Sequence, residues 1–148
     1  MRLVLDASAA LAWFVQRTDS REAPLADEIL SNVEQEEAVV PALWFTEVIN
    51  GLLVAERSRH ASPAKVALFL GEIAALPIAE DGVRPSVTQA EVLALARRHV
   101  LSAYDAVYME LALRTGRALA TFDKRLAKAV RKAGGQVFGD APRTRSHQ

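Results

Sequence analysis

The amino-acid sequence predicts an α/β protein, a three-layer α/β/α sandwich around a central parallel β-sheet. The main observation is that short apolar runs alternate with helical patterns along the whole chain. Strands that are separated by helices pair in parallel and carry helices on both faces of the sheet. A chain of 148 residues, of which 51% are hydrophobic, is also long enough to bury one sizeable core.

Five short apolar runs are predicted as strands. In chain order they cover residues 3–5, 38–40, 76–79, 119–122 and 136–138. Asp6 directly follows the first strand, and Asp123 directly follows the fourth. Ligands of open parallel sheets bind beyond the carboxyl ends of the strands. The two aspartates are therefore expected at the edge where active sites form.

Helix boundaries are indicated by capping residues, proline and glycine. Ser62 followed by Pro63 predicts one helix start, Ser102 predicts another, and Gly116 is a typical stop. The predicted helices cover residues 8–16, 24–32, 41–59, 63–75, 86–98 (or 88–98), 103–116 and 124–133.

The chain is predicted to form one domain over residues 1–140, followed by a basic, flexible C-terminal tail over residues 141–148. It contains no cysteine, which excludes disulfides, zinc-thiolate sites and a cysteine nucleophile. No leader-like segment precedes the first strand, and no apolar stretch approaches the roughly 20 residues that span a bilayer. We therefore expect a cytoplasmic protein that does not interact with membranes.

The net charge is zero, but the charges are unevenly distributed along the chain. Residues 1–96 contain 7 basic and 14 acidic residues, whereas residues 97–148 contain 11 basic and 4 acidic residues. This asymmetry indicates a polyanionic partner for one face. Folding that interleaves the two halves would instead give a mixed surface, and charge alone does not decide between these interpretations.

Glu47 lies more than one turn into its predicted helix, where neither a cap nor the helix dipole explains a carboxylate. Together with Thr46 and Asn50 it forms a narrow polar strip on a helix that is otherwise apolar nearly all round. This pattern is typical of a buried helix that faces a site.

Asp105 lies on the helix face opposite the one that Glu110 and Arg114 mark as the solvent face. It shares that opposite face with Tyr108 and other apolar side chains, so a carboxylate there needs an explanation. A capping arrangement with Ser102, three residues earlier, is the structural alternative.

Asp6 and Asp123 also have a structural alternative, because each could cap the helix that follows it. Ser8 could cap the first of these helices as well, which leaves Asp6 less well explained than Asp123.

Buried carboxylates must be paired, protonated or bound to a metal ion. The three histidines show no ligand spacing, so a shared site would consist of aspartate and glutamate oxygens. Such oxygens suit Mg²⁺ or Mn²⁺ and leave coordination positions for phosphate oxygens. The chemistry indicated is metal-assisted hydrolysis of a phosphoryl group with metal-activated water.

Four segments give the chain a resemblance to a known family: "LVLDASA", "TEVINGL", "SAYDAVYMELA" and "ALATFDKRL". In their order and spacing the chain resembles PIN-domain ribonucleases and, among these, the VapC-type toxins of toxin–antitoxin pairs. The resemblance spans nearly the whole chain. It implies a PIN-like fold and an endoribonuclease that depends on Mg²⁺ or Mn²⁺.

The resemblance also implies which residues form the site and what the partners are. The acidic quartet of catalytic residues and metal ligands carries over to Asp6, Glu47, Asp105 and Asp123. The supporting residues are Ser8, Thr121 and Asn50. The implied partners are an RNA substrate, a VapB-type antitoxin and a second copy of the chain, with helix surfaces in residues 8–60 expected to hold the antitoxin or the dimer contact.

A basic stripe follows Asp123 on the last predicted helix. It consists of Lys124, Lys128, Arg131 and Lys132, at i, i+4, i+7 and i+8 spacing. A track for RNA phosphates is one interpretation, and an ordinary solvated helix face is the other.

Two alternatives to a metal-dependent nuclease remain open from the sequence. A phosphohydrolase could use Asp6 as a nucleophile after the first strand, although haloacid-dehalogenase-like folds have a second aspartate where this chain has Ser8. A non-catalytic binding module would use the carboxylates only as helix caps.

Overall fold

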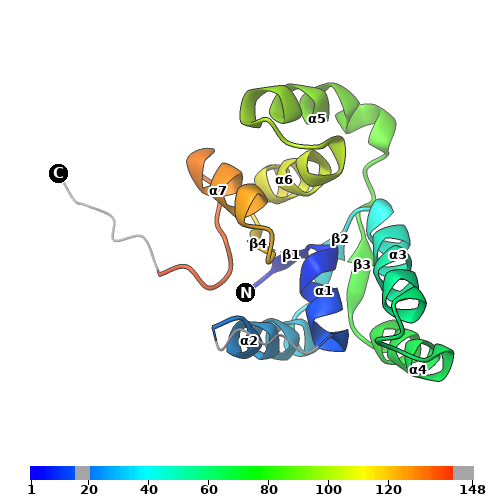
Figure 1. The fold of residues 1–148 in the computed structure, drawn as a ribbon. Helices are drawn as coiled ribbons and strands as arrows, with labels where there is room; N and C mark the ends of the chain where they lie inside the picture. Colours follow the sequence, from blue (N-terminus) through cyan, green and yellow to red (C-terminus); the bar gives the residue numbers. More distant parts are fainter. Residues whose placement is uncertain (16–20, 142–148) are drawn as a thin grey trace.

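The computed structural model of the chain describes residues 1–15 and 21–141. Its centre is a parallel sheet with the strand order β3-β2-β1-β4. Figure 1 shows α1, α2 and α3 on one side of this sheet and α5, α6 and α7 on the other. The strands and helices are β1 (Leu3–Leu5), α1 (Ala7–Phe14), α2 (Glu22–Gln35), β2 (Ala38–Val40), α3 (Leu43–Arg57), α4 (Pro63–Ala74), β3 (Ile78–Glu80), α5 (Pro85–His99), α6 (Ala103–Thr115), β4 (Ala118–Ala120) and α7 (Lys124–Lys132). The predicted three-layer α/β/α sandwich is confirmed.

The middle of the sheet is buried from solvent. Val4 on β1 pairs in register with Val39 on β2 and with Leu119 on β4. All residues of β1, β2 and β4 are buried, because helices cover both faces of these strands. The carboxyl ends of β1 and β4 are therefore held rigidly side by side, and the residues that follow them share one edge.

The capping signals correctly located two helix starts. The Ser62 hydroxyl accepts a hydrogen bond from the Lys65 backbone N–H, with Pro63 at the first helical position of α4. The Ser102 hydroxyl accepts one from the Asp105 N–H at the start of α6, and Gly116 ends that helix with φ +65°. The sequence predicts the start of α5 at residue 86 or 88. The helix begins one residue earlier, at Pro85, because proline suits the first helical position.

The predicted strand at 136–138 is wrong. Only a single bridge forms there, between Val137 and Leu119. The Leu119 N–H donates to the Gln136 carbonyl, and the Phe138 N–H donates to the Leu119 carbonyl. The chain then turns away at Gly139, whose φ of +95° is incompatible with a continued strand.

Two expectations about helix faces are also wrong. α3 buries only one face, and its side chains Phe45, Ile49 and Val54 are 44%, 49% and 57% exposed. Glu110, expected on the solvent face of α6, is buried. It lines a cavity together with Thr88 and Val92 of α5, and its charge is paired with Arg114 at 2.7 Å. Arg114 also pairs with Asp81 at 2.6 Å.

The last residues of the expected tail, 142–148, lie outside the described residues. The first helix, expected to run to residue 16, ends at Phe14, because the backbone of Val15 is extended. Within residues 1–15 and 21–141, no helix is both long enough and apolar enough to cross a bilayer.

Gly51 and Gly71 provide a matched test of how α1 packs on α3. A Cβ atom at Gly51 would collide with the Leu11 side chain, whereas a Cβ at Gly71 would meet no atom within 4 Å. Gly71→Ala should stabilise the protein by about 0.5–1 kcal/mol, because alanine loses less backbone entropy in a helix. Gly51→Ala should be at least about 1 kcal/mol less stable than Gly71→Ala, because Leu11 must move. Urea unfolding measures both, and equal gains would contradict this packing.

Candidate active site

The four carboxylates that the sequence singled out line one cavity of about 480 Å³ at the carboxyl edge of the sheet. Asp6 follows β1, Asp123 follows β4, Glu47 lies in the second turn of α3, and Asp105 lies in the first turn of α6. Because these positions come from four separate parts of the chain, the fold itself brings the four side chains together.

Asp6 is the most deeply buried of the four, with an exposed fraction of 7%. Its Oδ2 atom accepts hydrogen bonds from the Ser8 and Thr121 hydroxyls, each at 2.6 Å. Burial raises the pKa of the Asp6 carboxyl, and the two hydroxyl donors partly oppose that rise. Asp6 occupies the N-cap position of α1, but its side chain makes no capping bond, so capping does not account for this carboxylate.

Ser8 and Thr121 connect the two aspartates that follow the strands. The Ser8 hydroxyl accepts a hydrogen bond from the Phe122 N–H, and the Thr121 hydroxyl accepts one from the Asp123 N–H, both at 3.0 Å. The loop that carries Asp123 is therefore fixed to the same hydroxyl groups that hold Asp6. This supports the role of positioning residues for both.

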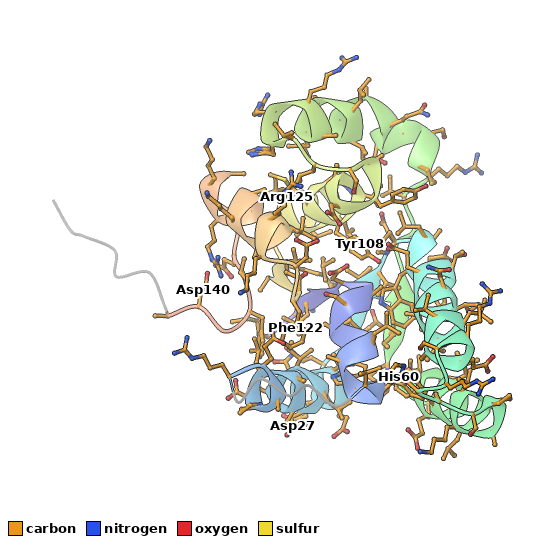
Figure 2. All side chains as sticks on the ribbon, viewed as in Figure 1. Asp27, His60, Tyr108, Phe122, Arg125 and Asp140 are labelled. Atoms are coloured by element: carbon orange, nitrogen blue, oxygen red, sulfur yellow. The ribbon has the colours of Figure 1, made fainter. Side chains whose placement is uncertain are left out.

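Glu47 is held by a residue that sequence reasoning had assigned to packing. The buried Tyr108 side chain, labelled in Figure 2, donates its phenolic O–H to Glu47 Oε1 at 2.7 Å. Burial raises the pKa of Glu47, and burial together with this hydrogen bond raises the pKa of Tyr108. The available signal was that Tyr108 lies three residues after Asp105, one turn along the same helix face.

Asp105 is the carboxylate most affected by its neighbours. The pKa of Asp105 is raised to about 6, and burial is the largest cause. The negative charges of Asp123, Asp6 and Glu47 add to this rise. Within the described ranges its carboxylate accepts no hydrogen bond, although its backbone N–H is capped by Ser102. The capping arrangement is therefore real, but it uses the backbone of Asp105 and not its carboxylate.

Asp123 does cap the helix that follows it, since its Oδ1 atom accepts a hydrogen bond from the Leu126 N–H at 3.0 Å. Its Oδ2 atom has no partner among the residues that the structure describes. Capping and site formation are therefore compatible at this position, because the two oxygens serve separate purposes.

The donor set limits which cation the cavity suits. Among the described residues, no three or more Asp, Glu, His or Cys side chains are arranged as a preformed metal-binding site. Asp6, Glu47 and Asp123 each have one oxygen engaged and the other available for a ligand. An all-oxygen, mutually repelling set of this kind fits Mg²⁺, which is held by one or two carboxylates and retains several waters.

Three further polar residues, Thr46, Asn50 and Tyr104, line the cavity. Asn50 lies one turn after Glu47 on α3, as expected from the polar strip. Tyr104, which sequence reasoning did not single out, lies in the first turn of α6 and is 64% exposed. The structure thus places one further aromatic side chain beside the carboxylates.

The basic stripe is only partly brought together. Lys124, Lys128 and Arg131 line a second cavity on α7, but Lys132 does not. Arg131 forms two hydrogen bonds with Asp140, at 2.7 and 2.9 Å. The helical spacing predicted one continuous stripe. In the structure, three of its four residues line the cavity and Lys132 does not.

Comparisons with known proteins place this chain in a family. Ribonuclease VapC3 from two strains of Mycobacterium tuberculosis is 29% identical to this chain over 128 residues, which covers 86% of this chain and 87% of the relative. The crystal structure of PAE2754 from Pyrobaculum aerophilum has a similar fold, with a TM-score of 0.64 and 24% identity over 87% of this chain and 79% of that chain. The family model described as "PIN domain" matches residues 3–132. The resemblance seen in the sequence is thereby confirmed, and the chain belongs to the PIN domain family.

Proposed function

We propose that this PIN-domain protein is an endoribonuclease that hydrolyses RNA phosphodiester bonds with Mg²⁺ or Mn²⁺. The observation that carries the proposal is that Asp6, Glu47, Asp105 and Asp123 line one cavity at the carboxyl edge of the sheet. Family membership and the similarity to a protein named as a ribonuclease support the same reaction. When bound, the divalent ion would activate water and stabilise charge on the phosphate oxygens.

The chain's own residues supply position and charge for this reaction. Ser8 and Thr121 hold Asp6 Oδ2, which leaves Oδ1 as the oxygen available to a ligand. Tyr108 holds Glu47 Oε1 in the same way and leaves Oε2. Preorganised carboxylates need no rearrangement during the reaction, which is how a rigid site contributes to catalysis.

Asp105 is suited to metal binding. In the metal-free protein its pKa is raised to about 6, and its carboxylate is not tied to a hydrogen-bond donor in the described part of the chain. A bound cation would favour the ionised form of this carboxylate, so Asp105 would act as a ligand and as a charge partner of the metal ion.

We further propose that the protein acts in the cytoplasm as the toxin of a toxin–antitoxin pair and forms a homodimer. The exposed apolar side chains Phe45, Ile49 and Val54 on α3 support a partner surface within residues 8–60. A VapB-type antitoxin segment is the partner proposed for one such surface.

The other interpretations have less support. An aspartyl nucleophile must be free to attack, but Asp6 is buried and its Oδ2 atom accepts two hydrogen bonds. A module with purely structural carboxylates would not bring four of them to one cavity without compensating cations.

The first prediction concerns activity. The purified chain should cleave single-stranded RNA with Mg²⁺ or Mn²⁺ and stop when EDTA is added. Asp6→Asn should reduce cleavage at least about 100-fold, because a neutral amide is a poor ligand for a hard cation. Glu91→Gln, on an exposed site of α5, is the matched control and should cleave normally. Cleavage that persists in EDTA, or a phosphorylated Asp6, would contradict the proposal.

The second prediction concerns stability. A carboxyl whose pKa is raised on folding favours the native state only while it is protonated, so that contribution is lost as pH rises from about 4 to about 6. At pH 7.5 in EDTA, Asp105→Asn should therefore be more stable than wild type. We expect the free energy of unfolding to increase by about 1–2 kcal/mol. This is less than the full pKa shift would give, because solvent screens the charge of this half-exposed group. At pH 4 the advantage should disappear.

Thermal melts at both pH values, with EDTA and with excess Mg²⁺, measure this effect. Mg²⁺ should stabilise the wild type and have little effect on Asp105→Asn, because bound ligand stabilises only the state that holds it. An Asp105→Asn variant that melts lower in EDTA and still cleaves RNA would show that Asp105 has only a capping role.

The third prediction concerns Tyr108. Tyr108→Phe removes the donor to Glu47 Oε1 but keeps the aromatic ring in the core. The Mg²⁺ concentration for half-maximal cleavage should rise about 10–100-fold, since groups that orient metal ligands have effects of this size. The KM for RNA at saturating Mg²⁺ should remain within about twofold. A variant with unchanged Mg²⁺ dependence would show that the hydrogen bond serves only packing.

A further inference from the structure

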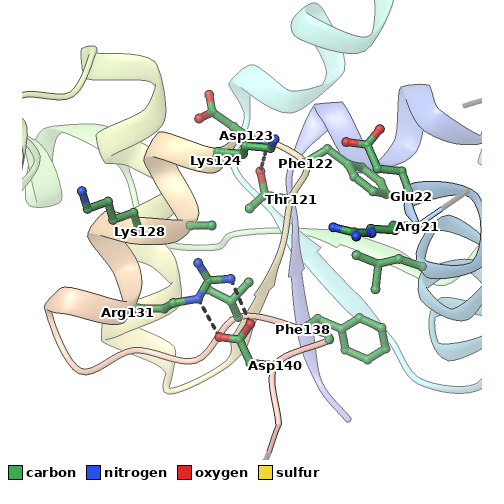
Figure 3. Close-up of a pocket in the computed structure, with 14 residues that line it drawn as sticks. Arg21, Glu22, Thr121, Phe122, Asp123, Lys124, Lys128, Arg131, Phe138 and Asp140 are labelled. Atoms are coloured by element: carbon green, nitrogen blue, oxygen red, sulfur yellow. Dashed lines mark hydrogen bonds and ion pairs between the residues drawn. The ribbon is translucent and has the colours of Figure 1, made fainter. Parts of the chain in front are cut away.

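A second cavity, of about 490 Å³, lies on the other side of the loop that carries Asp123 (Figure 3). It runs between the start of α2, the loop 121–123, α7 and the segment that follows α7. Asp123 lines both this cavity and the carboxylate cavity. A chain-like ligand that occupies the carboxylate site would reach this groove by passing the loop at Asp123, which borders both cavities.

One wall of the groove is cationic. Lys124 and Lys128 lie one turn apart on α7 and line the groove together with Arg131. Figure 3 shows the Lys128 side chain extending from α7 away from Phe138. Neither lysine forms an ion pair within residues 1–15 and 21–141, whereas Arg131 is paired with Asp140. The opposite face of α7 is buried through Leu126 and Val130, so the fold fixes which way the two lysines are presented.

The remaining walls combine apolar and aromatic side chains with the charged side chains of Arg21, Glu22 and Asp140. Phe122 and Phe138 line the groove, and both rings are only partly buried. Figure 3 shows Phe138 across the groove from α7. The chain near Phe138 is held in place, because Leu25 packs against Gly139 and Asp140 pairs with Arg131. The aromatic wall is therefore part of the folded structure.

Lysines on one wall and aromatic rings on another form the combination that proteins use for single-stranded nucleic acid. Lysines neutralise phosphates, and aromatic rings stack with bases regardless of sequence. The volume also lies within the roughly 300–1,000 Å³ range of small-ligand sites. An acidic peptide would use the lysines but would leave the aromatic wall without a specific partner.

We propose that this groove binds a nucleotide that flanks the scissile phosphate of single-stranded RNA. Lys124 and Lys128 contact its phosphate, and Phe138 stacks with its base. The proposal rests on the proposed function for its substrate, but it concerns binding outside the carboxylate site. It also separates Lys128 from Lys132, which has the same charge on the same helix but does not line the groove.

The test is fluorescence anisotropy with a labelled octauridylate in EDTA, so that binding is measured without cleavage. Lys128→Gln should weaken binding about 3–10-fold and reduce the slope of log affinity against log salt by about 0.7, the value for one phosphate contact on a single strand. Lys132→Gln, the matched control, should change the affinity less than twofold. Equal losses in the two variants would overturn the groove assignment, because long-range charge alone would explain them.

An abasic strand of the same length separates stacking from charge. Phe138→Leu should weaken the binding of octauridylate at least about fivefold, which is the lower end of what one stacked base contributes. It should leave the binding of the abasic strand unchanged. Lys128→Gln should weaken the binding of both strands. Phe138→Leu losses that are equal on both strands, or tighter Lys128-dependent binding of polyglutamate than of octauridylate, would contradict a nucleotide site.

The outcomes also distinguish this proposal from the proposed function. If the chain binds octauridylate normally but never cleaves RNA, the proposed nuclease activity is contradicted and the groove proposal still holds. If Lys128→Gln and Phe138→Leu do not affect RNA cleavage at subsaturating RNA, the groove proposal is contradicted and the proposed nuclease activity still holds.

Discussion

The hydrogen bonds to Asp6 Oδ2 are the interaction on which the rest of the site depends. The Asp6 carboxylate, at the end of a central strand, is almost fully removed from water. The hydroxyls of Ser8 and Thr121 donate hydrogen bonds to it and partly compensate its burial. The same hydroxyls accept hydrogen bonds from Phe122 and Asp123. Burial of one charge thereby determines the path of the loop that carries the second aspartate, and it fixes the boundary between the two cavities.

This arrangement leaves the edge of the sheet with an excess of negative charge. Four carboxylates approach one cavity, and their mutual repulsion contributes to the raised pKa of Asp105. A protein keeps such a cluster when a cation or a proton compensates it in the working state. Beyond Asp123 the lining changes to lysines and aromatic rings. On the function that we propose, the first cavity would hold a metal ion and the second a phosphate of the RNA chain.

The architecture and the location of the site were predictable from the sequence because they depend on local patterns. Asp6 and Asp123 each follow an apolar run, and parallel strands bring such residues to one edge. The strand predicted at 136–138 failed because apolar character does not show where the chain turns. The burial of Glu110 and the bond from Tyr108 to Glu47 were missed for a related reason. Both depend on contacts between helices that are far apart in the sequence.

The central claim is that the four carboxylates form one repelling cluster that takes up a divalent cation. Isothermal titration calorimetry with Mg²⁺ at pH 6, in two buffers of different ionisation enthalpy, tests this claim most directly. Because the pKa of Asp105 is about 6, this carboxyl is half protonated at that pH, and binding should release at least about half a proton per ion. At pH 8 the release should vanish while Mg²⁺ still binds. Mg²⁺ binding without proton release at pH 6, or no binding at either pH, would contradict the account.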